Sequence, residues 1–259
     1  MESSRSMKTT ILTNEKFQDS GVPIFTVCVL LFNDYPELAL RCLSKLSLLV
    51  SDGAIALRIG TNAISQRTAD VIGHLGLDEY VSCRSQENIR KYPMMKRLFA
   101  SPNAPQGGSI GVATPFVMWF DDDSYISADN PHEWLAAVKH EMTSTDMLGS
   151  VYSIRLKGNQ SSWVMRQPWY AGLPVPHLHR TSYCTGGWWT IRTDLLLKFQ
   201  WPIPELVHRG GDVMLGELFR QQRLRITHFR EGVAINADAD GTESNSPRRG
   251  YDSDPIGFE

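Results

Sequence analysis

Apolar runs alternate with segments of helical periodicity along most of the chain. Residues 24–32 (IFTVCVLLF) are almost free of polar side chains, which predicts a central strand covered on both faces. A helix is expected next, to about Leu49, because Asp34 can cap it, Glu37 follows three residues later as in a capping box, and Pro36 suits the first turn. The ordered part of the chain therefore begins with a strand and a helix.

The alternation continues into the C-terminal quarter. It predicts strands at 54–59, 80–83, 115–120, 147–156, 188–191 and 225–229, and helices at 66–75, 92–100, 130–141, 194–199 and 211–222. The segment 157–182 contains Trp, Pro and His with little periodicity, as many binding surfaces do. We expect one α/β domain over 21–235, preceded by a disordered segment at 1–20 and followed by a flexible tail at 236–259.

Composition narrows the class of protein. With 259 residues and 42% hydrophobic content the chain can bury a large core, and 26 basic against 28 acidic residues create no sequence-wide attraction to nucleic acid or an anionic membrane. The four cysteines are widely spaced, mostly among apolar neighbours, which indicates reduced thiols and no disulfide. No apolar run reaches the roughly 18 residues that span a bilayer, so we expect no transmembrane segment and a cytoplasmic location.

Three carboxylates stand at the end of the apolar run 115–120. Side chains alternate along a strand, so Asp121 and Asp123 point to one side while Asp122 points elsewhere. Neighbouring carboxylates repel one another unless a cation neutralises them, and hard oxygen ligands suit Mg²⁺ or Mn²⁺. The pattern predicts a divalent cation on Asp121 and Asp123 that holds a diphosphate. The alternative is a solvated turn whose acids cap the structure that follows.

The order of several short motifs resembles a glycosyltransferase of the GT-A fold, most like family 2. The segments that carry the resemblance are 25–34, 60–65, 87–89, the DxD motif at 120–123, the GG-aromatic-x-x-R segment at 186–192, and 210–213 in the place of the family's G-[ED]-D. The resemblance implies an α/β fold with a mixed, mostly parallel, Rossmann-like sheet flanked by helices. It also implies a nucleotide-diphosphate sugar as donor, with UDP as the expected nucleotide.

For catalysis, the resemblance implies that Asp212 is the general base of an inverting transfer. Gly211 stands where the family has the first acid of a pair, so a retaining outcome stays open, and a helix cap is the alternative role for Asp212. His228 is the expected third metal ligand, since such enzymes often supply one after the last core strand; the alternative is a structural histidine. His177 and His179 are spaced so that both could face one ligand.

For the donor, the resemblance places the nucleotide at the ends of the first two strands. Asn62 takes the place of the family's usual acid, so an amide hydrogen bond would read the base, unless Asn62 is only a turn residue. Arg90 and Lys91 could reach the phosphates or lie on a solvated surface. The residues expected to contact the nucleotide are Phe32, Asn33, Asp34, Asn62, Lys91, Asp121, Asp122, Arg248 and Arg249.

Two further segments are assigned to ligands. Gly187, Trp188 and Trp189 are expected on the sugar side, because tryptophan faces stack on sugar rings, although one of the two rings should belong to the core. Arg248 and Arg249 in the tail lead to the hypothesis of a lid that clamps the diphosphate on closure. The alternative is a disordered charged tail.

We therefore expect a metal-dependent glycosyltransferase that uses Mn²⁺ or Mg²⁺ and a nucleotide sugar. Its acceptor hydroxyl is open: saccharide, lipid, protein and modified nucleic acid all remain candidates. A sugar-nucleotide nucleotidyltransferase is the first alternative, although such enzymes carry a Gly-rich, basic loop after the first strand and this loop is Asn33-Asp34-Tyr35-Pro36. The second alternative is a non-catalytic carbohydrate-binding protein of degenerate GT-A fold.

Overall fold

The centre of the molecule is a mixed sheet of seven strands. The computed structural model describes residues 22–100, 110–156, 158–175, 180–238 and 240–242. In spatial order the strands are β3 (Val81–Ser85), β2 (Ala56–Asn62), β1 (Phe25–Phe32), β4 (Phe116–Asp121), β7 (Thr181–Arg192), β6 (Met147–Ile154) and β8 (Ile226–His228). β1 pairs in parallel with β2 and β4, whereas β7 runs antiparallel to β4 and β6. The predicted α/β class with a mixed, mostly parallel sheet is confirmed.

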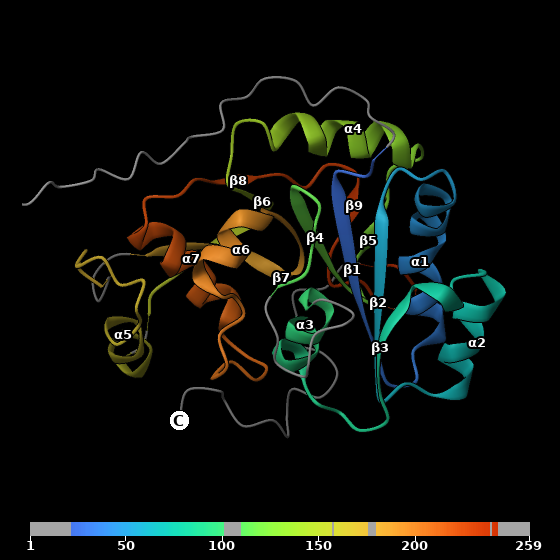
Figure 1. The fold of residues 1–259 in the computed structure, drawn as a ribbon, viewed down its shortest axis with the longest axis horizontal. Coiled ribbons are helices and arrows are strands. Elements are labelled where there is room, and N and C mark those ends of the chain that lie inside the picture. The colour runs from blue at the N-terminus through green and yellow to red at the C-terminus, as the bar shows by residue number, and fades with distance from the viewer. Residues whose placement is uncertain (1–21, 101–109, 157, 176–179, 239, 243–259) are drawn as a thin grey trace, which may run out of the picture.

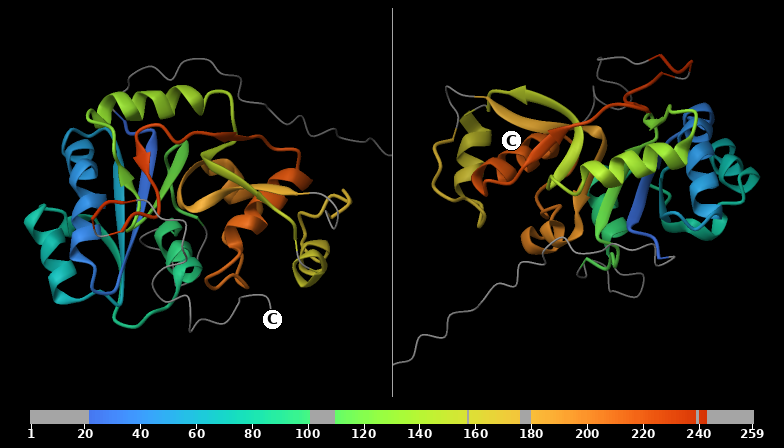
Figure 2. Two further views of the ribbon diagram at one scale, coloured as in Figure 1. Left: turned by 180° about the vertical axis from the view of Figure 1, so that it is seen from behind. Right: turned by 90° about the horizontal axis from the view of Figure 1, so that it is seen from above.

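Helices cover both faces of this sheet (Figure 1). They are α1 (Pro36–Ser51), α2 (Gln66–His74), α3 (Lys91–Phe99), α4 (Pro131–Glu141), α5 (Gly158–Met165), α6 (Thr193–Phe199) and α7 (Gly211–Gln221), with a 3₁₀ turn at Asp78–Tyr80. Residues of α1, α2 and α4 pack on one face and those of α3, α5, α6 and α7 on the other. A small sheet of β5 (Tyr125–Ile126) and β9 (Val233–Ala234) lies beside α1. The front and rear views both place α2 and α5 at opposite ends of the molecule (Figures 1 and 2).

The sheet separates two apolar cores. Alternation along β1 sends Val27 and Val29 into the core beneath α1, and Cys28 and Leu30 into the core beneath α3 and α7. All four of these side chains are buried. The prediction of a central strand covered on both faces is therefore confirmed.

Three expectations about individual elements were wrong. Strand β7 covers 181–192 and not only 188–191, because its polar first half is held by pairing with β6. Helix α5 forms inside the segment expected to be irregular, where Trp163 and Val164 bury its apolar side. Asp34 does not cap α1: Tyr35 is the N-cap residue and contributes no side-chain hydrogen bond.

Some expectations fall outside the described residues. These are the segment at 1–20, most of the tail, and the side chains of His177, His179, Arg248 and Arg249. Cys28, Cys42, Cys83 and Cys184 are free thiols. Within the part of the chain that the structure describes, no helix combines the length and the apolar character needed to cross a membrane.

Candidate active site

The acidic motif lies where β1 and β4 end at the same edge of the sheet. The two strands are parallel, with Leu30 opposite Asp121 in the register. Asp122 is buried, and its Oδ2 accepts a hydrogen bond from the Phe32 main-chain N at 3.2 Å. Asp122 therefore fastens the end of β4 to the end of β1, and its contact with the nucleotide stays a prediction. The side chain of Phe32 is half-buried.

Asp121 is held between a lysine and a tryptophan. Its Oδ2 accepts a hydrogen bond from Lys91 Nζ at 2.5 Å, and its Oδ1 accepts one from Trp119 Nε1 at 2.9 Å. Burial raises the pKa of Asp121 to about 6; the Lys91 charge opposes this shift and the nearby Asp123 carboxylate adds to it. The partner of Lys91 here is thus a carboxylate of the DxD motif, and its contact with the nucleotide phosphates stays a prediction.

Asp212 reaches the same region from the first turn of α7. Its Oδ1 accepts a hydrogen bond from the Val213 main-chain N at 3.0 Å. Burial raises the pKa of Asp212, while the charge of Lys91 and backbone N–H groups oppose the shift. A carboxylate with a raised pKa takes a proton more readily, which suits a general base.

Packing explains why Asp212 has no acidic neighbour on its N-terminal side. A Cβ atom on Gly211 would lie 2.1 Å from Cζ of Tyr92, so the ring of Tyr92 occupies the space that any side chain would need. Gly210 before it has a φ of 76°, in the left-handed region that favours glycine. The two glycines therefore serve the turn and the contact with Tyr92.

A bulge in β7 brings Gly186 next to Lys91, the residue that both Asp121 and Asp212 approach. The register between β6 and β7 shifts beside Gly149, and β7 contains the extra residues. A Cβ atom on Gly186 would lie 2.9 Å from Lys91 Nζ and 3.7 Å from Asp212 Oδ2. Gly186 O also accepts a hydrogen bond from Lys91 Nζ at 2.7 Å. Lys91, Asp121, Asp212 and Gly186 thus form one cluster, called the acid–lysine cluster below.

The residues predicted on the sugar side are packed inside the protein. A Cβ atom on Gly187 would lie 2.6 Å from Ser124 Oγ, so this glycine is required by a close packing contact. Trp188 is 0% exposed and Trp189 is 2% exposed. The Trp189 ring stacks on Trp119 with 6.1 Å between centroids. Neither indole offers a face to a sugar, so the stacking expected for them is not supported by this arrangement.

The side-chain amide of Asn62 supports a loop. It is 2% exposed, its Nδ2 donates to Asn88 Oδ1 at 3.0 Å, and its Oδ1 accepts from the Ile89 N at 2.9 Å. Asn88 Oδ1 also accepts from the Arg90 N at 2.9 Å. Because both ends of the Asn62 amide are used within the protein, the predicted reading of a base by this amide is not supported.

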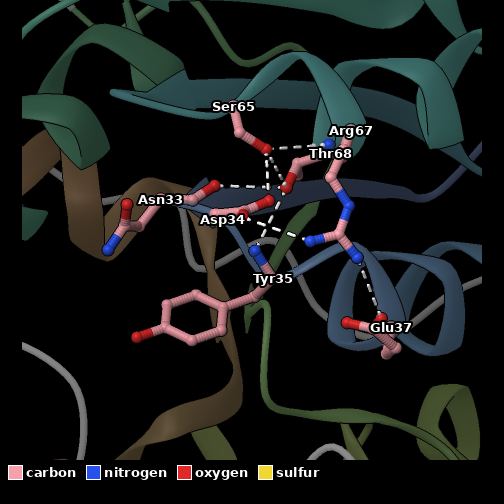
Figure 3. Close-up of polar contacts among 7 residues, drawn as sticks. All are labelled: Asn33, Asp34, Tyr35, Glu37, Ser65, Arg67 and Thr68. Atoms are coloured by element: carbon pink, nitrogen blue, oxygen red, sulfur yellow. Dashed lines mark hydrogen bonds and ion pairs between the residues drawn. The ribbon is translucent and has the colours of Figure 1, made fainter.

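Figure 3 shows the polar contacts where β1 ends beside α2. Ser65 Oγ donates to Asp34 Oδ1 at 2.5 Å, and Arg67 forms ion pairs with Asp34 at 3.3 Å and with Glu37 at 3.5 Å. The exposed side chain of Asn33 points away from these contacts. Asp34 therefore joins two elements of the protein, while the amide of Asn33 is turned outward at the predicted nucleotide end of the sheet.

His228 lies far from the acidic motif. It is on β8, and three strand intervals of about 4.8 Å separate β8 from β4, so the two strands are about 14 Å apart. Its Nδ1 accepts a hydrogen bond from the Val151 N at 3.0 Å. Its ring lines a separate cavity of about 810 Å³ together with Glu141 and Arg230. His228 therefore cannot complete a metal site with Asp121 and Asp123.

The segment that follows β9 also reaches the DxD turn, which its sequence does not indicate. Ala237 N donates to the Asp123 main-chain O at 2.7 Å, and Asn236 N donates to Ser124 Oγ at 3.4 Å. Asn236 has a φ of 55°, which asparagine tolerates better than most residues. These contacts attach the start of the expected tail to the DxD turn. An asparagine in a polar run was the available signal, but it fits any turn.

The donor set suits a cation that shares its coordination with phosphate. Asp121 and Asp123 supply hard carboxylate oxygens, and the two groups are close enough for the charge of one to shift the pKa of the other. Among the described residues, no three His, Cys, Asp or Glu side chains gather closely enough to hold a metal. Mg²⁺ is commonly bound by one or two carboxylates together with substrate phosphates. Asp121 and Asp123 fit a site of this kind. Two carboxylates are too few to enclose a metal with protein ligands alone.

Comparison with known proteins gives structural likeness only. No protein-family model and no curated protein matches the sequence. The chain is similar to the mannosyltransferase PcManGT from Pyrobaculum calidifontis, solved in complex with GDP-Man and Mn²⁺, with a TM-score of 0.47, 15% identity, and coverage of 81% of this chain and 55% of that one. It is also similar to S. aureus TarS 1–349, with a TM-score of 0.46, 14% identity, and coverage of 80% and 58%. The chain thus spans somewhat more than half of each.

Proposed function

We propose that the protein is a glycosyltransferase of the GT-A type, which moves a sugar from a nucleotide-diphosphate sugar to an acceptor hydroxyl. The observation that carries this proposal is the acid–lysine cluster at the ends of β1 and β4. It places one carboxylate of the DxD motif and a second carboxylate of raised pKa around a single lysine. In open α/β sheets, ligands bind outside the carboxyl ends of the strands, which is where this cluster lies.

Asp212 is the proposed general base. Its Oδ1 is held by the Val213 N, which fixes the carboxylate, and its Oδ2 faces Gly186, where a side chain would collide with Lys91 Nζ. A single base that takes the acceptor proton supports inversion of the transferred sugar. Because Tyr92 excludes a second acid at position 211, Asp212 performs this role alone.

On the donor side, Asp121 and Asp123 would hold Mn²⁺ or Mg²⁺ together with the diphosphate. Such a cation stabilises the negative charge of the departing diphosphate. Lys91 Nζ supplies a positive charge beside the same oxygens, and the outward amide of Asn33 is available to the nucleoside. We propose a UDP-sugar as the donor, in line with the family 2 resemblance.

A thermal-shift panel of UDP- and GDP-sugars, with and without Mn²⁺, tests the donor, because a bound ligand raises the melting temperature as its concentration exceeds the dissociation constant. The Asp212→Asn variant tests the general base. Its melting temperature should still rise with the donor, while its rate of donor hydrolysis should fall by at least about 100-fold. Glu205→Gln, at an exposed position in the preceding loop, is the matched control and should hydrolyse the donor like the wild type.

The outcomes separate the candidate functions. A carbohydrate-binding protein would show ligand shifts and no hydrolysis in the wild type. Absence of any shift with the whole panel, or hydrolysis that survives Asp212→Asn unchanged, would contradict the proposed enzyme.

A further inference from the structure

Lys91 is hydrogen-bonded to Asp121 Oδ2, an oxygen that a cation on the DxD motif would need as a ligand. The side chain of Lys91 is 11% exposed, and its Nζ donates to Asp121 Oδ2 at 2.5 Å and to Gly186 O at 2.7 Å. It also lies 5.7 Å from the centroid of the Trp119 ring. Nζ therefore has two oxygen partners and an aromatic face, and it is almost enclosed.

The backbone before Lys91 is constrained to aim it there. Arg90 has a φ of 73° and a ψ of 173°, a region that residues other than glycine rarely adopt. Asn88 Oδ1 holds the Arg90 N at 2.9 Å, and Asn62 in turn holds Asn88. A conformation of this kind persists only where its surroundings enforce it. The buried amide of Asn62 thus acts on the site through the position of Lys91.

Both carboxylate oxygens of Asp121 already have donors. Oδ1 accepts from Trp119 and Oδ2 accepts from Lys91. A divalent cation on Asp121 would lie beside the ammonium at close range in a partly buried site, where like charges repel strongly. A diphosphate, by contrast, offers Nζ oxygens of the same kind with more negative charge. The long, flexible lysine stem can follow them.

We propose that Lys91 couples the binding of the divalent cation to that of the nucleotide diphosphate. The diphosphate takes over Nζ, Asp121 is released to the cation, and neither ligand binds tightly without the other. This inference rests on the proposed function, since it takes a nucleotide diphosphate as the ligand of the site. It assigns to Lys91 the role of a binding residue that sets the order of assembly.

The test measures three affinities by titration calorimetry: Mn²⁺ alone, UDP in chelator, and UDP with saturating Mn²⁺, with GDP as a second nucleotide. In the wild type we expect Mn²⁺ to tighten UDP binding by about tenfold or more. In Lys91→Met, Mn²⁺ alone should bind about tenfold tighter than in the wild type, and UDP in chelator about tenfold weaker. Lys96→Met, which removes the same charge elsewhere on α3, should match the wild type in all three.

Two further variants test whether the effect depends on the charge of Lys91 and on Asp121. Lys91→Arg keeps the charge and should bind Mn²⁺ alone as weakly as the wild type, which separates charge from folding. In an Asp121→Asn background, Lys91→Met should no longer strengthen Mn²⁺ binding. If UDP and GDP both fail to bind the wild type, the proposed function falls and the coupling with it. If the nucleotide binds but Lys91→Met leaves the Mn²⁺ affinity unchanged, the coupling alone is overturned.

Discussion

Asp121 is a partly buried carboxylate with a raised pKa. Burial raises its pKa to about 6, which means that the folded protein holds its proton more firmly than the unfolded chain does. The Lys91 charge reduces this shift without cancelling it. Ionisation of Asp121 therefore lowers the free energy of unfolding. A residue that serves binding rather than stability is expected to behave in this way.

The pH dependence of stability tests this balance. A raised carboxyl pKa gives stability that is fully present below the unfolded value of 3.8 and is lost as the pH rises through about 6. The free energy of unfolding of the wild type, relative to Asp121→Asn, should therefore fall between pH 4 and pH 7 and then level off. Urea denaturation in chelator at each pH measures it. Parallel curves for the two proteins would contradict the raised pKa.

At the scale of elements, the contact between α7 and β7 places Asp212. A Cβ atom on Gly216 would lie 2.3 Å from the Ser182 main-chain O, so the helix packs directly on the strand at this point. The same strand carries the bulge with Gly186. The distance between helix and strand thus decides how closely Asp212 approaches the bulge.

Two glycine-to-alanine substitutions distinguish the packing of α7 on β7 from the effect of helix propensity on stability. Gly216→Ala should lower the free energy of unfolding by about 1–3 kcal/mol, because its methyl group meets the backbone of β7. Gly73→Ala in α2 meets only Asp78 Oδ2 at 3.5 Å, so it should raise stability by about 0.5–1 kcal/mol. Urea unfolding of both variants measures the difference. Equal effects would show that α7 can move away from β7.

At the scale of the whole molecule, the sheet divides the apolar interior into two cores, and two adjacent tryptophans belong to different ones. Trp188 contacts Phe120 and Trp134 in the core beneath α1 and α4. Trp189 contacts Phe99 in the core beneath α3. Successive side chains alternate between the two faces of β7 and both faces are covered, so neither ring reaches solvent.

Conservative replacement distinguishes packing from sugar binding at these positions. Trp188→Phe and Trp189→Phe should each lower the free energy of unfolding by about 1–3 kcal/mol through lost packing. The affinity of the folded variants for a nucleotide sugar should stay within about twofold of the wild type, since neither ring touches the site. Unfolding curves and calorimetry check the two halves. A large loss of affinity at unchanged stability would restore the stacking hypothesis.

Local patterns were enough to predict the framework of the fold and the place of its acids. The strands that became β1 and β4 are short and apolar because both of their faces are covered, and a run of this kind is visible without knowing its neighbours. The helix expected at 130–141 was equally visible and became α4, whose Asn130 cap acts within a few residues of itself. Asp121 and Asp212 were both chosen from motifs, and the structure brings both to Lys91.

The roles of individual polar residues depended on partners far away in the sequence. Asn62 looked like a contact for a base, yet its partner is Asn88. His228 looked like a metal ligand, yet it lies three strands from the acidic motif. Neither outcome has a local signature, because each depends on where the strands lie once the sheet has assembled.

An α/β sheet with a carboxylate cluster at the end of a buried strand follows from local sequence alone, since hydrophobic periodicity and composition act over a few neighbouring residues. The folded arrangement shows that Lys91 and not a histidine stands beside those carboxylates, and that Gly186 and not Gly187 faces them. Charge and close packing act through space, so they are settled only when distant segments meet.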